Sequence, residues 1–459
     1  MTVGAHAFAA RIWQALDGPP AVLGRLQVTG TGALPSAFAV SDLVAGSVGA
    51  AALALAEVAG LTGPVSVDRR LASCWCATSL RPEGWRVPDP WDPVAGDYET
   101  RDGWIRLHTN APHHRAAAER VLGPQVDRGG MARAVSGWAK GELEIAILAE
   151  GGCAAEMRGL VDWAAHPQGR AVAGEPLVRV DPGRERSGSA WTPRSGRPLA
   201  GLRVLDLTRV LAGPVATRFL AGFGADVLRI DPPDWNEAPI EPELTLGKTC
   251  ARLDLRRDAD RTTFEALLAG ADVLVHGYRP GALDGLGYGA EARWALAPGL
   301  VEVCLDAYGW TGPWAGRRGF DSLVQMSTGI AQAGQDWRQA AKPVPLPVQA
   351  LDHATGYMMA AAVLRLLARR LADGTGGAAR LSLARTAALL VEAGAAEPEP
   401  PCPDASPEDL APGIEATSWG PARRLRPPVA MAGVPMHWAR AARRLGDDAP
   451  DWAADGVST

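Results

Sequence analysis

A thirty-residue stretch at 202–231 limits the possible folds more than any other part of the chain. Residues 204–207 form a short apolar run with the length of a buried strand, and residues 227–230 form a second one. Between the two runs, Gly213-Pro214 opens a helix-forming segment, since proline suits the first position of a helix. A strand, a helix and a strand in this short length predict a βαβ unit and therefore a parallel sheet.

The loop at 208–213 follows the first of these strands. In open α/β sheets, ligands bind at the carboxyl ends of the strands, so this loop is a predicted ligand-binding position. The stretch lacks the GxGxxG pattern, and a dinucleotide site of the usual kind is therefore not supported.

The composition argues against several other classes of protein. A formal charge of −5 disfavours a nucleic-acid-binding protein, which normally carries a basic excess. We read no apolar run of membrane-spanning length, because Glu57 interrupts the longest candidate, and no signal peptide in residues 1–11. Six scattered cysteines predict reduced thiols and a cytoplasmic location. Cys74 and Cys76 are too close together for a zinc pair, so no metal site is predicted.

The pattern along the chain predicts six segments. Residues 199–392 alternate strands with helices, as a domain with a parallel sheet does. Residues 80–180 carry a hairpin with its turn at Asp102-Gly103 and two helices, at 112–123 and 129–151, which predicts a smaller α+β domain. The remaining segments are a partial repeat (1–79), a polar linker (181–198), a disordered linker rich in proline, glutamate and alanine (393–420) and a C-terminal tail that becomes helical (421–459).

The partial repeat is inferred from two similar segments of the chain, which we call the internal echo. Asp42 and Asp352 each stand four residues before a glycine at the start of an alanine-rich helix, and each helix precedes a short strand that contains a serine. Chance similarity between two alanine-rich helices is the alternative. In the first copy we expect Asp42 to cap its helix and to bind no ligand.

A series of motifs runs through residues 199–392. In chain order they are 199–214, 224–230, Gly247-Lys248, 253–255, 272–275, Arg279-Pro280-Gly281, 309–313, 319–321 and 352–356. In this order they resemble the large domain of the class III CoA-transferases, the family that contains formyl-CoA transferase, carnitine CoA-transferase and α-methylacyl-CoA racemase. Residues 97–172 resemble the family's small domain, which follows the large domain there and precedes it here.

The resemblance implies an architecture as well as a family. It implies an α/β fold with a Rossmann-like parallel sheet in the large domain, a smaller α+β domain, and an interlocked homodimer. Residues 421–452 resemble the C-terminal segment of the family. The repeat at 1–79 would then duplicate the second half of the large domain, as the product of a circular-permutation-like rearrangement.

The resemblance places the family's catalytic carboxylate at Asp352 and a supporting acid at Asp321. We expect the dipole and the free N–H groups of a helix N-terminus to keep the Asp352 carboxylate ionised at neutral pH. The implied reaction moves coenzyme A from an acyl-CoA donor to a carboxylic acid, through an aspartyl anhydride and an aspartyl-CoA thioester. Coenzyme A is thus a substrate, and no permanently bound cofactor is expected. Taken alone, Asp352 is more readily read as an N-cap, since aspartate is a preferred cap.

Nine further positions match or adjoin the family's coenzyme A site. Arg256 and Arg318 suit phosphate groups because arginine binds phosphate in a forked geometry, although each alone reads as a surface arginine. The full set is Val210, Leu211, Lys248, Leu253, Arg256, Gly277, Tyr278, Arg279 and Arg318. His113 and His114 are read as surface residues, and His353 as facing either the site or solvent.

Some positions depart from the family pattern. Phe320 stands where the racemase branch carries a histidine, which argues against racemisation. The glycine-rich loop that closes over the nucleophile in several relatives would lie at 87–96, which holds one glycine, and Pro232 and Gly285 occupy two phosphate-binding positions. These departures keep a catalytically silent acyl-CoA-binding protein as the alternative to a CoA-transferase. An unrelated Rossmann-like enzyme is disfavoured by the missing GxGxxG pattern.

Overall fold

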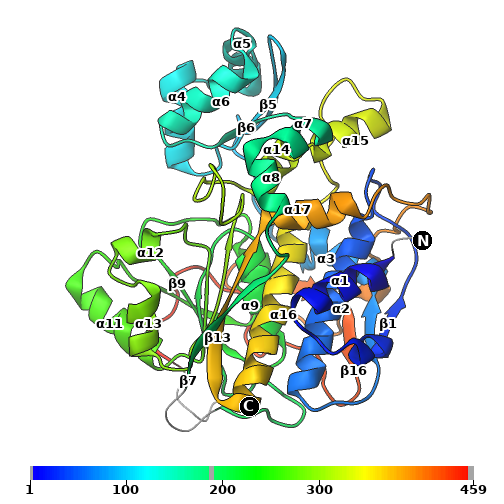
Figure 1. Ribbon diagram of the computed structural model, residues 1–459, viewed down its shortest axis with the longest axis vertical. Coiled ribbons are helices and arrows are strands. Elements are labelled where there is room, and N and C mark those ends of the chain that lie inside the picture. Colours follow the sequence, from blue (N-terminus) through cyan, green and yellow to red (C-terminus); the bar gives the residue numbers. More distant parts are fainter. Residues whose placement is uncertain (1–3, 186–190, 453–459) are drawn as a thin grey trace.

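The computed structural model describes residues 4–185 and 191–452, and its largest element is a seven-stranded sheet (Figure 1). The strands are β7 (Arg179–Glu185), β8 (Arg203–Leu207), β9 (Asp226–Asp231), β10 (Lys248–Arg252), β11 (Val273–His276), β12 (Val301–Asp306) and β13 (Thr375–Ser382). Their order in the sheet is β10-β9-β8-β11-β12-β13-β7, with β7 antiparallel at one edge and the others parallel. Counted from β8, the parallel strands have the order 3-2-1-4-5-6 of a doubly wound sheet, which confirms the predicted α/β class.

Helices cover both faces of this sheet. They include α9 (Ala212–Gly222) and α16 (Ala350–Asp373) on one face, and α11 (Asp258–Ala269), α12 (Ala282–Gly285) and α13 (Ala290–Leu296) on the other. On β8, Val204 packs with the α9 and α16 side chains, whereas Leu205 packs with Phe264 of α11. Successive strand residues point to opposite faces, so a sheet covered on both sides needs near-continuous apolar strands.

The N-terminal segment contains a helix–strand–helix unit that lies beside a similar unit of the large domain. Its elements are α1 (Ala5–Ala15), η1 (Pro20–Arg25), β1 (Leu26–Thr29), α2 (Val40–Val58), β2 (Val65–Asp68) and α3 (Arg69–Ala77). The order α2, β2, α3 repeats the order α16, β13, α17 (Leu383–Glu392), and α2 lies against α16. Strand β2 pairs with β1 and with β16 (Val429–Met431) in a separate three-stranded sheet.

The two glycines of the internal echo serve the same purpose. A Cβ atom on Gly46 would lie 2.6 Å from the carbonyl oxygen of Ala5 in α1. A Cβ atom on Gly356 would lie 2.4 Å from the carbonyl oxygen of Ala212 in α9. Each glycine therefore lets a neighbouring helix approach α2 or α16 at a distance that no side chain would permit.

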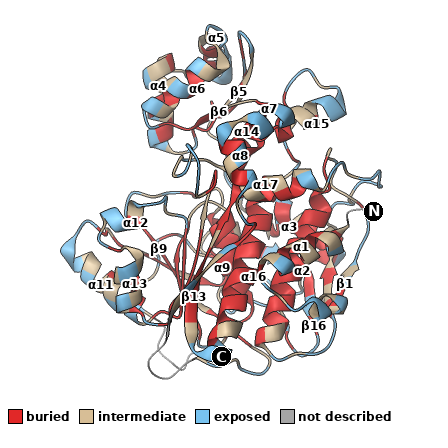
Figure 2. Ribbon diagram, in the orientation of Figure 1, coloured by how far each residue is buried: buried red, intermediate tan, exposed pale blue. Residues whose placement is uncertain are grey.

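Helix α2 corrects our reading of the hydropathy. Val40–Val58 is long and apolar enough to cross a membrane, and 89% of that window is buried inside the fold. Figure 2 shows α9 and α16 as buried over most of their length. A helix that is packed on all sides is apolar all round, and Glu57 lies at its end, where it pairs with Arg365.

The small domain has its own core. It contains β4 (Gly96–Thr100), β5 (Gly103–Leu107), β6 (Ala154–Glu156), α4 (Pro112–Leu122), α5 (Arg128–Ser136) and α6 (Lys140–Ala149), followed by α7 (Leu160–Ala165) and α8 (Pro167–Ala173). The hairpin of β4 and β5 turns at Arg101-Asp102, one residue before the predicted turn at Asp102-Gly103. The single helix predicted at 129–151 is wrong, because Gly137 ends α5 and Ala139 has the extended backbone that begins α6.

Two predicted linkers are folded. Residues 179–185 form the edge strand β7, so only part of the segment 181–198 is a connection, and residues 186–190 lie outside the described residues. The disorder predicted for 393–420 is wrong, because Pro401 bridges to Ala33 and Glu399 pairs with Arg69. This proline-rich stretch is fixed by pairing with the N-terminal segment, which no local pattern reveals.

The predicted helical tail is also wrong. Residues 421–452, all of which are described, form part of β15 (Gly420–Arg424), β16 and loops. Pro427, Pro428 and Pro435 lack the N–H groups that a helix needs. The indole of Trp438 donates a hydrogen bond to the Arg218 carbonyl and so anchors the loop on α9. The remaining elements are β3 (Leu80–Pro82), α10 (Glu241–Leu244), α14 (Asp321–Ser327), α15 (Ile330–Arg338), η2 (Pro407–Asp409) and β14 (Glu415–Thr417).

Candidate active site

A cavity of about 510 Å³ lies where three parts of the chain meet. The first part of its lining is residues 75–78 at the end of α3. The second part is Trp91, which precedes β4, and His108, which follows β5. The large domain supplies the third part, with Val210, Leu211, Asp321 and Asp352. Val210 and Leu211 follow β8, and residues 235–240 follow β9. The cavity therefore lies at the carboxyl ends of parallel strands, beside the strand where the order of the sheet reverses.

Two carboxylates meet at the wall of this cavity. Asp352 is the third residue of α16 and is 7% exposed, and Asp321 is the first residue of α14 and is 1% exposed. The backbone N–H of Asp352 donates to Oδ2 of Asp321 at 3.0 Å. The Gln325 side chain donates to Oδ1 of Asp321 and accepts from the Leu346 N–H at 2.7 Å, which ties α14 to the chain before α16.

Burial raises the pKa of both carboxyls. For Asp352 the pKa lies well above its usual range, first because of burial and then because of the charge of Asp321. For Asp321 burial raises the pKa to about 6, although hydrogen bonds from Asp352, Gln325 and Leu351 oppose the shift. Desolvation therefore opposes the helix dipole that we expect to keep Asp352 ionised. The two acids titrate as a pair.

The matching acid of the repeat has a different environment. Asp42 is the third residue of α2, and its carboxylate forms a two-point ion pair with Arg69, at 2.9 Å for both contacts. Arg69 also pairs with Glu399, and the Asp42 carboxylate accepts from the Ala5 N–H at 3.1 Å. The predicted cap is wrong, since these partners lie on other elements. Asp42 lies outside the cavity lining.

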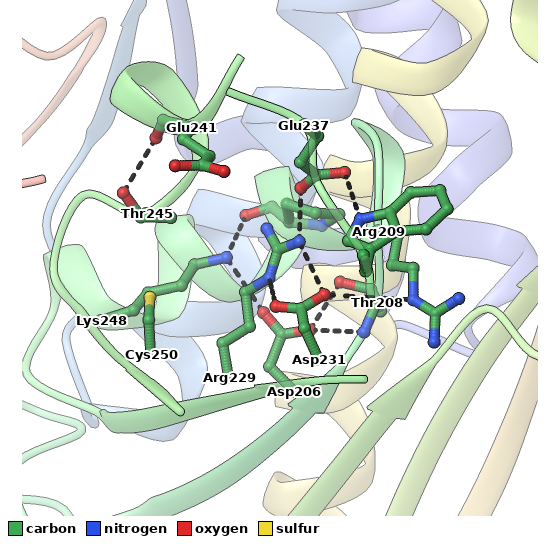
Figure 3. A network of polar contacts seen from close by, with 12 residues as sticks. Asp206, Thr208, Arg209, Arg229, Asp231, Glu237, Glu241, Thr245, Lys248 and Cys250 are labelled. Carbon is green, nitrogen blue, oxygen red and sulfur yellow. Dashed lines mark hydrogen bonds and ion pairs between the residues drawn. The ribbon is translucent and has the colours of Figure 1, made fainter. Parts of the chain in front are cut away.

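A buried polar network fixes the start of the loop at 208–213 (Figure 3). Asp206, at the end of β8, accepts hydrogen bonds from the N–H and hydroxyl of Thr208 at 2.9 and 2.5 Å. Its other oxygen accepts from Thr217 at 2.5 Å and from Lys248 at 3.0 Å. Burial favours a neutral acid, but Lys248 and Arg229 hold the pKa of Asp206 below its usual value.

The middle of the same loop is held in a strained conformation. Val210 has a φ of 65°, in the left-handed region that a β-branched residue rarely adopts. Its N–H donates to Glu237 at 2.9 Å, and Glu237 also accepts from the guanidinium of Arg229. Arg229 in turn forms a two-point ion pair with Asp231 (Figure 3). The network therefore presents Val210 and Leu211 to the cavity.

The structure corrects the prediction for Lys248. This residue is 0% exposed, and its ammonium group donates to Asp206 and to the Pro214 carbonyl, each at 3.0 Å. It supports the sheet beneath the loop and cannot contact a ligand in the cavity. The motif Gly247-Lys248 thus marks a structural lysine.

Of the other predicted coenzyme A contacts, some line the cavity and some do not. Val210 and Leu211 line the cavity, whereas Leu253, Arg256, Gly277, Tyr278, Arg279 and Arg318 lie outside its lining. Arg256 is exposed and pairs with Asp254 at 2.7 Å. Arg279 and Arg318 are both exposed, and burial and the charge of Arg318 lower the pKa of Arg279. Contact between these residues and coenzyme A stays a prediction.

The sequence did not point to the cavity walls outside the large domain. The guanidinium carbon of Arg218 lies 4.9 Å from the centroid of the Trp75 ring. The His108 ring stacks on the Phe320 ring, with the two centroids 3.7 Å apart. The concentration of tryptophan between 75 and 91 is a local signal for a binding wall. Its distance along the chain from Asp352 hides the contact, which only folding creates.

Of the three histidines considered in the sequence, one differs in burial from its prediction. His353 is buried, lines the cavity, and has its pKa lowered to about 3, first by burial. His114 was predicted at the surface and is buried, with its ring nitrogen 3.5 Å from Sγ of Cys153 and its pKa lowered to about 4 by burial. His113 is exposed, as predicted.

Known proteins resemble parts of this chain. The model of the family described as CoA-transferase family III matches residues 199–456. The acetyl-coenzyme A transferase nodX of Hypoxylon pulicicidum is 34% identical over 220 residues, which cover 46% of this chain and 37% of that protein. A probable fatty acyl-CoA transferase of Mycobacterium tuberculosis is 28% identical over 288 residues, which cover 58% of this chain and 72% of that protein.

Two further matches extend the comparison. The succinyl-CoA:glutarate CoA-transferase of Mus musculus is 32% identical over 216 residues, covering 42% of this chain and 49% of that protein. A solved structure of a CaiB/BaiF family protein from Brucella suis is 27% identical with a TM-score of 0.39, covering 49% of this chain and 65% of that chain. The matched parts thus span from 37% to 72% of the curated relatives named here.

Proposed function

Because the chain belongs to CoA-transferase family III, we propose that it moves coenzyme A from an acyl-CoA thioester to a carboxylic acid, with Asp352 as the nucleophile. The observation that supports this most directly is the buried pair of Asp352 and Asp321 at the wall of a cavity of about 510 Å³. The names of the relatives, acyl-CoA and succinyl-CoA transferases, support the same class of substrates.

In the proposed reaction, an oxygen of the Asp352 carboxylate attacks the thioester carbon of the acyl-CoA. The C–S bond breaks, the coenzyme A thiolate leaves, and an acyl-aspartyl anhydride remains. The thiolate then attacks the aspartyl carbon, which releases the first acid and leaves an aspartyl-CoA thioester. The acceptor carboxylate repeats the two steps in reverse, so that Asp352 is regenerated and a new acyl-CoA leaves.

Asp321 has two supporting roles in this proposal. It holds the N–H of Asp352, which fixes the start of α16 and the direction of the nucleophile. Its charge also raises the pKa of Asp352, so the two acids titrate as a pair and the nucleophile forms when the pair loses a proton. The aromatic wall of Trp75, Trp91 and Trp235 suits the apolar part of an acyl group.

The alternative of a silent acyl-CoA-binding protein receives no comparable support. A chain that had lost catalysis would have no reason to keep an acidic pair buried without a cationic partner, as Asp42 has in Arg69. The cavity retains both acids, and neither forms an ion pair among the described residues.

The test compares Asp352→Asn with the matched control Asp42→Asn. Asparagine keeps the shape of the side chain but cannot act as a carboxylate nucleophile, so we expect Asp352→Asn to lower the transfer rate by about 10³-fold or more. The free energy of unfolding should change by about 1 kcal/mol or less, because asparagine keeps the size of the side chain and adds no charge. Transfer is measured by the appearance of a new acyl-CoA from mixed donors and acids, and binding by titration with coenzyme A.

Asp42→Asn should retain the wild-type transfer rate. Full activity in Asp352→Asn would show that the nucleophile lies elsewhere. Coenzyme A binding without turnover in the wild type, for every donor and acid offered, would favour the silent protein.

A further inference from the structure

Two cysteines that are distant in the sequence meet beside the cavity. Cys74 lies in α3, and Cys402 lies in the proline-rich stretch between α17 and β14. Sγ of Cys74 lies 3.9 Å from the Pro403 carbonyl oxygen, and Sγ of Cys402 lies 3.7 Å from the same atom. Both sulfurs therefore lie within 4 Å of one carbonyl oxygen. Both are partly exposed, and all six cysteines of the chain are free thiols.

The surroundings of this pair favour a thiolate on one of the two sulfurs. The hydrogen bond with Cys74 lowers the pKa of Cys402 to about 7, and Arg70, Arg69 and Ser73 add to the effect against the opposing influence of burial. The same contact raises the pKa of Cys74. A thiolate beside a neutral thiol is the arrangement from which disulfides form, since the thiolate is the reactive form of cysteine.

The other four cysteines lack this arrangement. Cys76, Cys153, Cys250 and Cys304 are buried, and burial raises the pKa of each. Cys76 is next but one to Cys74 in the chain, but its side chain lies on the buried side of α3 and lines the cavity. It is therefore the internal competitor that a test must separate from Cys402.

The backbone around the pair is already docked. The Cys402 N–H donates to the Ala33 carbonyl at 2.8 Å, and Glu399 pairs with Arg69 at the start of α3. A bond between the two sulfurs would therefore link segments that are already packed together. The residues that follow Cys74 in α3, from Trp75 to Thr78, form one wall of the cavity.

We propose that Cys74 and Cys402 form a reversible disulfide when the protein meets a hydroperoxide, and that this bond locks α3, with its wall of the cavity, to the stretch at 399–403. In the first step the Cys402 thiolate attacks one peroxide oxygen, the O–O bond breaks, and a sulfenic acid and hydroxide form. In the second step Cys74 attacks the sulfenic sulfur, loses its thiol proton, and expels water. Two thiols are oxidised and one hydroperoxide is reduced.

The experiment treats the full chain with one equivalent of hydrogen peroxide, blocks the remaining thiols, and digests with trypsin without reductant. Cys74 and Cys76 lie on the tryptic peptide 71–86, and Cys402 lies on 386–423. We expect these two peptides to be joined, with the mass lower by two hydrogens, and separated again by dithiothreitol. Thiol titration in denaturant should fall from six thiols to four.

Three single variants assign the bond. Cys402→Ser and Cys74→Ser should each remove the joined peptides, and Cys76→Ser should retain them. Unfolding under reducing conditions shows that each variant is folded. Oxidation should raise the thermal midpoint of the wild type and of Cys76→Ser by several degrees, and should leave that of Cys402→Ser unchanged.

The results separate this inference from the proposed transferase activity, because neither readout needs turnover. A bond within the peptide 71–86 would assign the oxidation to Cys74 and Cys76 and would overturn the proposal. So would the absence of joined peptides, or an unchanged thermal midpoint in the oxidised wild type.

Discussion

At Asp352, burial and the charge of Asp321 both favour the protonated acid. Both influences oppose the carboxylate form that the proposed nucleophile needs, so the site becomes reactive when the pair loses a proton. The protonation of the pair depends on single contacts, since Asp321 accepts hydrogen bonds from the N–H of Asp352 and from Gln325. Reactivity at this site is therefore tuned by one neighbouring residue.

The transfer rate should rise with pH as the pair ionises. The pKa of Asp352 is raised, so its reactive carboxylate form is lost as the pH falls through the range in which the pair titrates. Asp321→Asn removes the neighbouring charge while its amide oxygen can still accept from the Asp352 N–H. We expect the acidic limb of kcat/KM to move to lower pH in this variant. A limb that stays in place, or that moves to higher pH, would contradict the coupling of the two acids.

Asp306 is a partly buried acid at the end of β12. Burial raises its pKa to about 7, which the hydrogen bond from the Gly309 N–H opposes and the charge of Glu175 assists. The folded protein therefore keeps the proton of Asp306 up to about pH 7, whereas the unfolded chain releases it near pH 4. Stability from this group is present at low pH and is lost as the pH rises between these values.

Asp306→Asn should remove that loss. Relative to the wild type, its free energy of unfolding should increase between pH 4 and pH 8, by about 2–4 kcal/mol. The amide can still accept from Gly309, so the loop keeps its contact. Urea unfolding at several pH values measures the difference. An equal pH dependence in the two proteins would mean that Asp306 is ionised when folded.

At the scale of the elements, the first residue of the helix after each repeat strand separates the two copies. It is Arg69 in α3 and Leu383 in α17. Arg69 neutralises Asp42 and pairs with Glu399, whereas Leu383 offers Asp352 no charge. The same helix–strand–helix unit thus contains a structural ion pair in one copy and an acid free for chemistry in the other.

Asp42→Asn should reduce stability without affecting the cavity. Arg69 keeps Glu399 as a partner, so the lost contacts are charged hydrogen bonds worth about 1–3 kcal/mol. Coenzyme A binding should equal that of the wild type. Urea unfolding and a coenzyme A titration on one preparation measure both effects. Weaker binding would mean that the N-terminal copy has a ligand site of its own.

At the scale of the whole molecule, one chain supplies every described wall of the cavity. Residues 75–78, Trp91 and His108 meet the large domain there. The homodimer that the family resemblance implies stays a prediction. Light scattering at micromolar concentration should give twice the chain mass, and a monomer would count against it.

The sequence by itself determined the features that depend on local pattern. Alternating strands and helices predicted the parallel sheet, and ordered motifs predicted the family and the acids Asp352 and Asp321. Val210 and Leu211 were placed at the ligand edge because a loop after a parallel strand can lie nowhere else. These properties follow from neighbours in the chain, which the order of the residues contains directly.

Only the tertiary structure decided which polar groups are buried together and which segments line the cavity. Lys248 became a buried partner of Asp206, and His114 a buried neighbour of Cys153. The raised pKa of Asp352, the wall from α3 and the meeting of Cys74 with Cys402 all depend on contacts between residues far apart in the sequence. Desolvation and ion pairing depend on what surrounds a group in space, and only the packed chain fixes that.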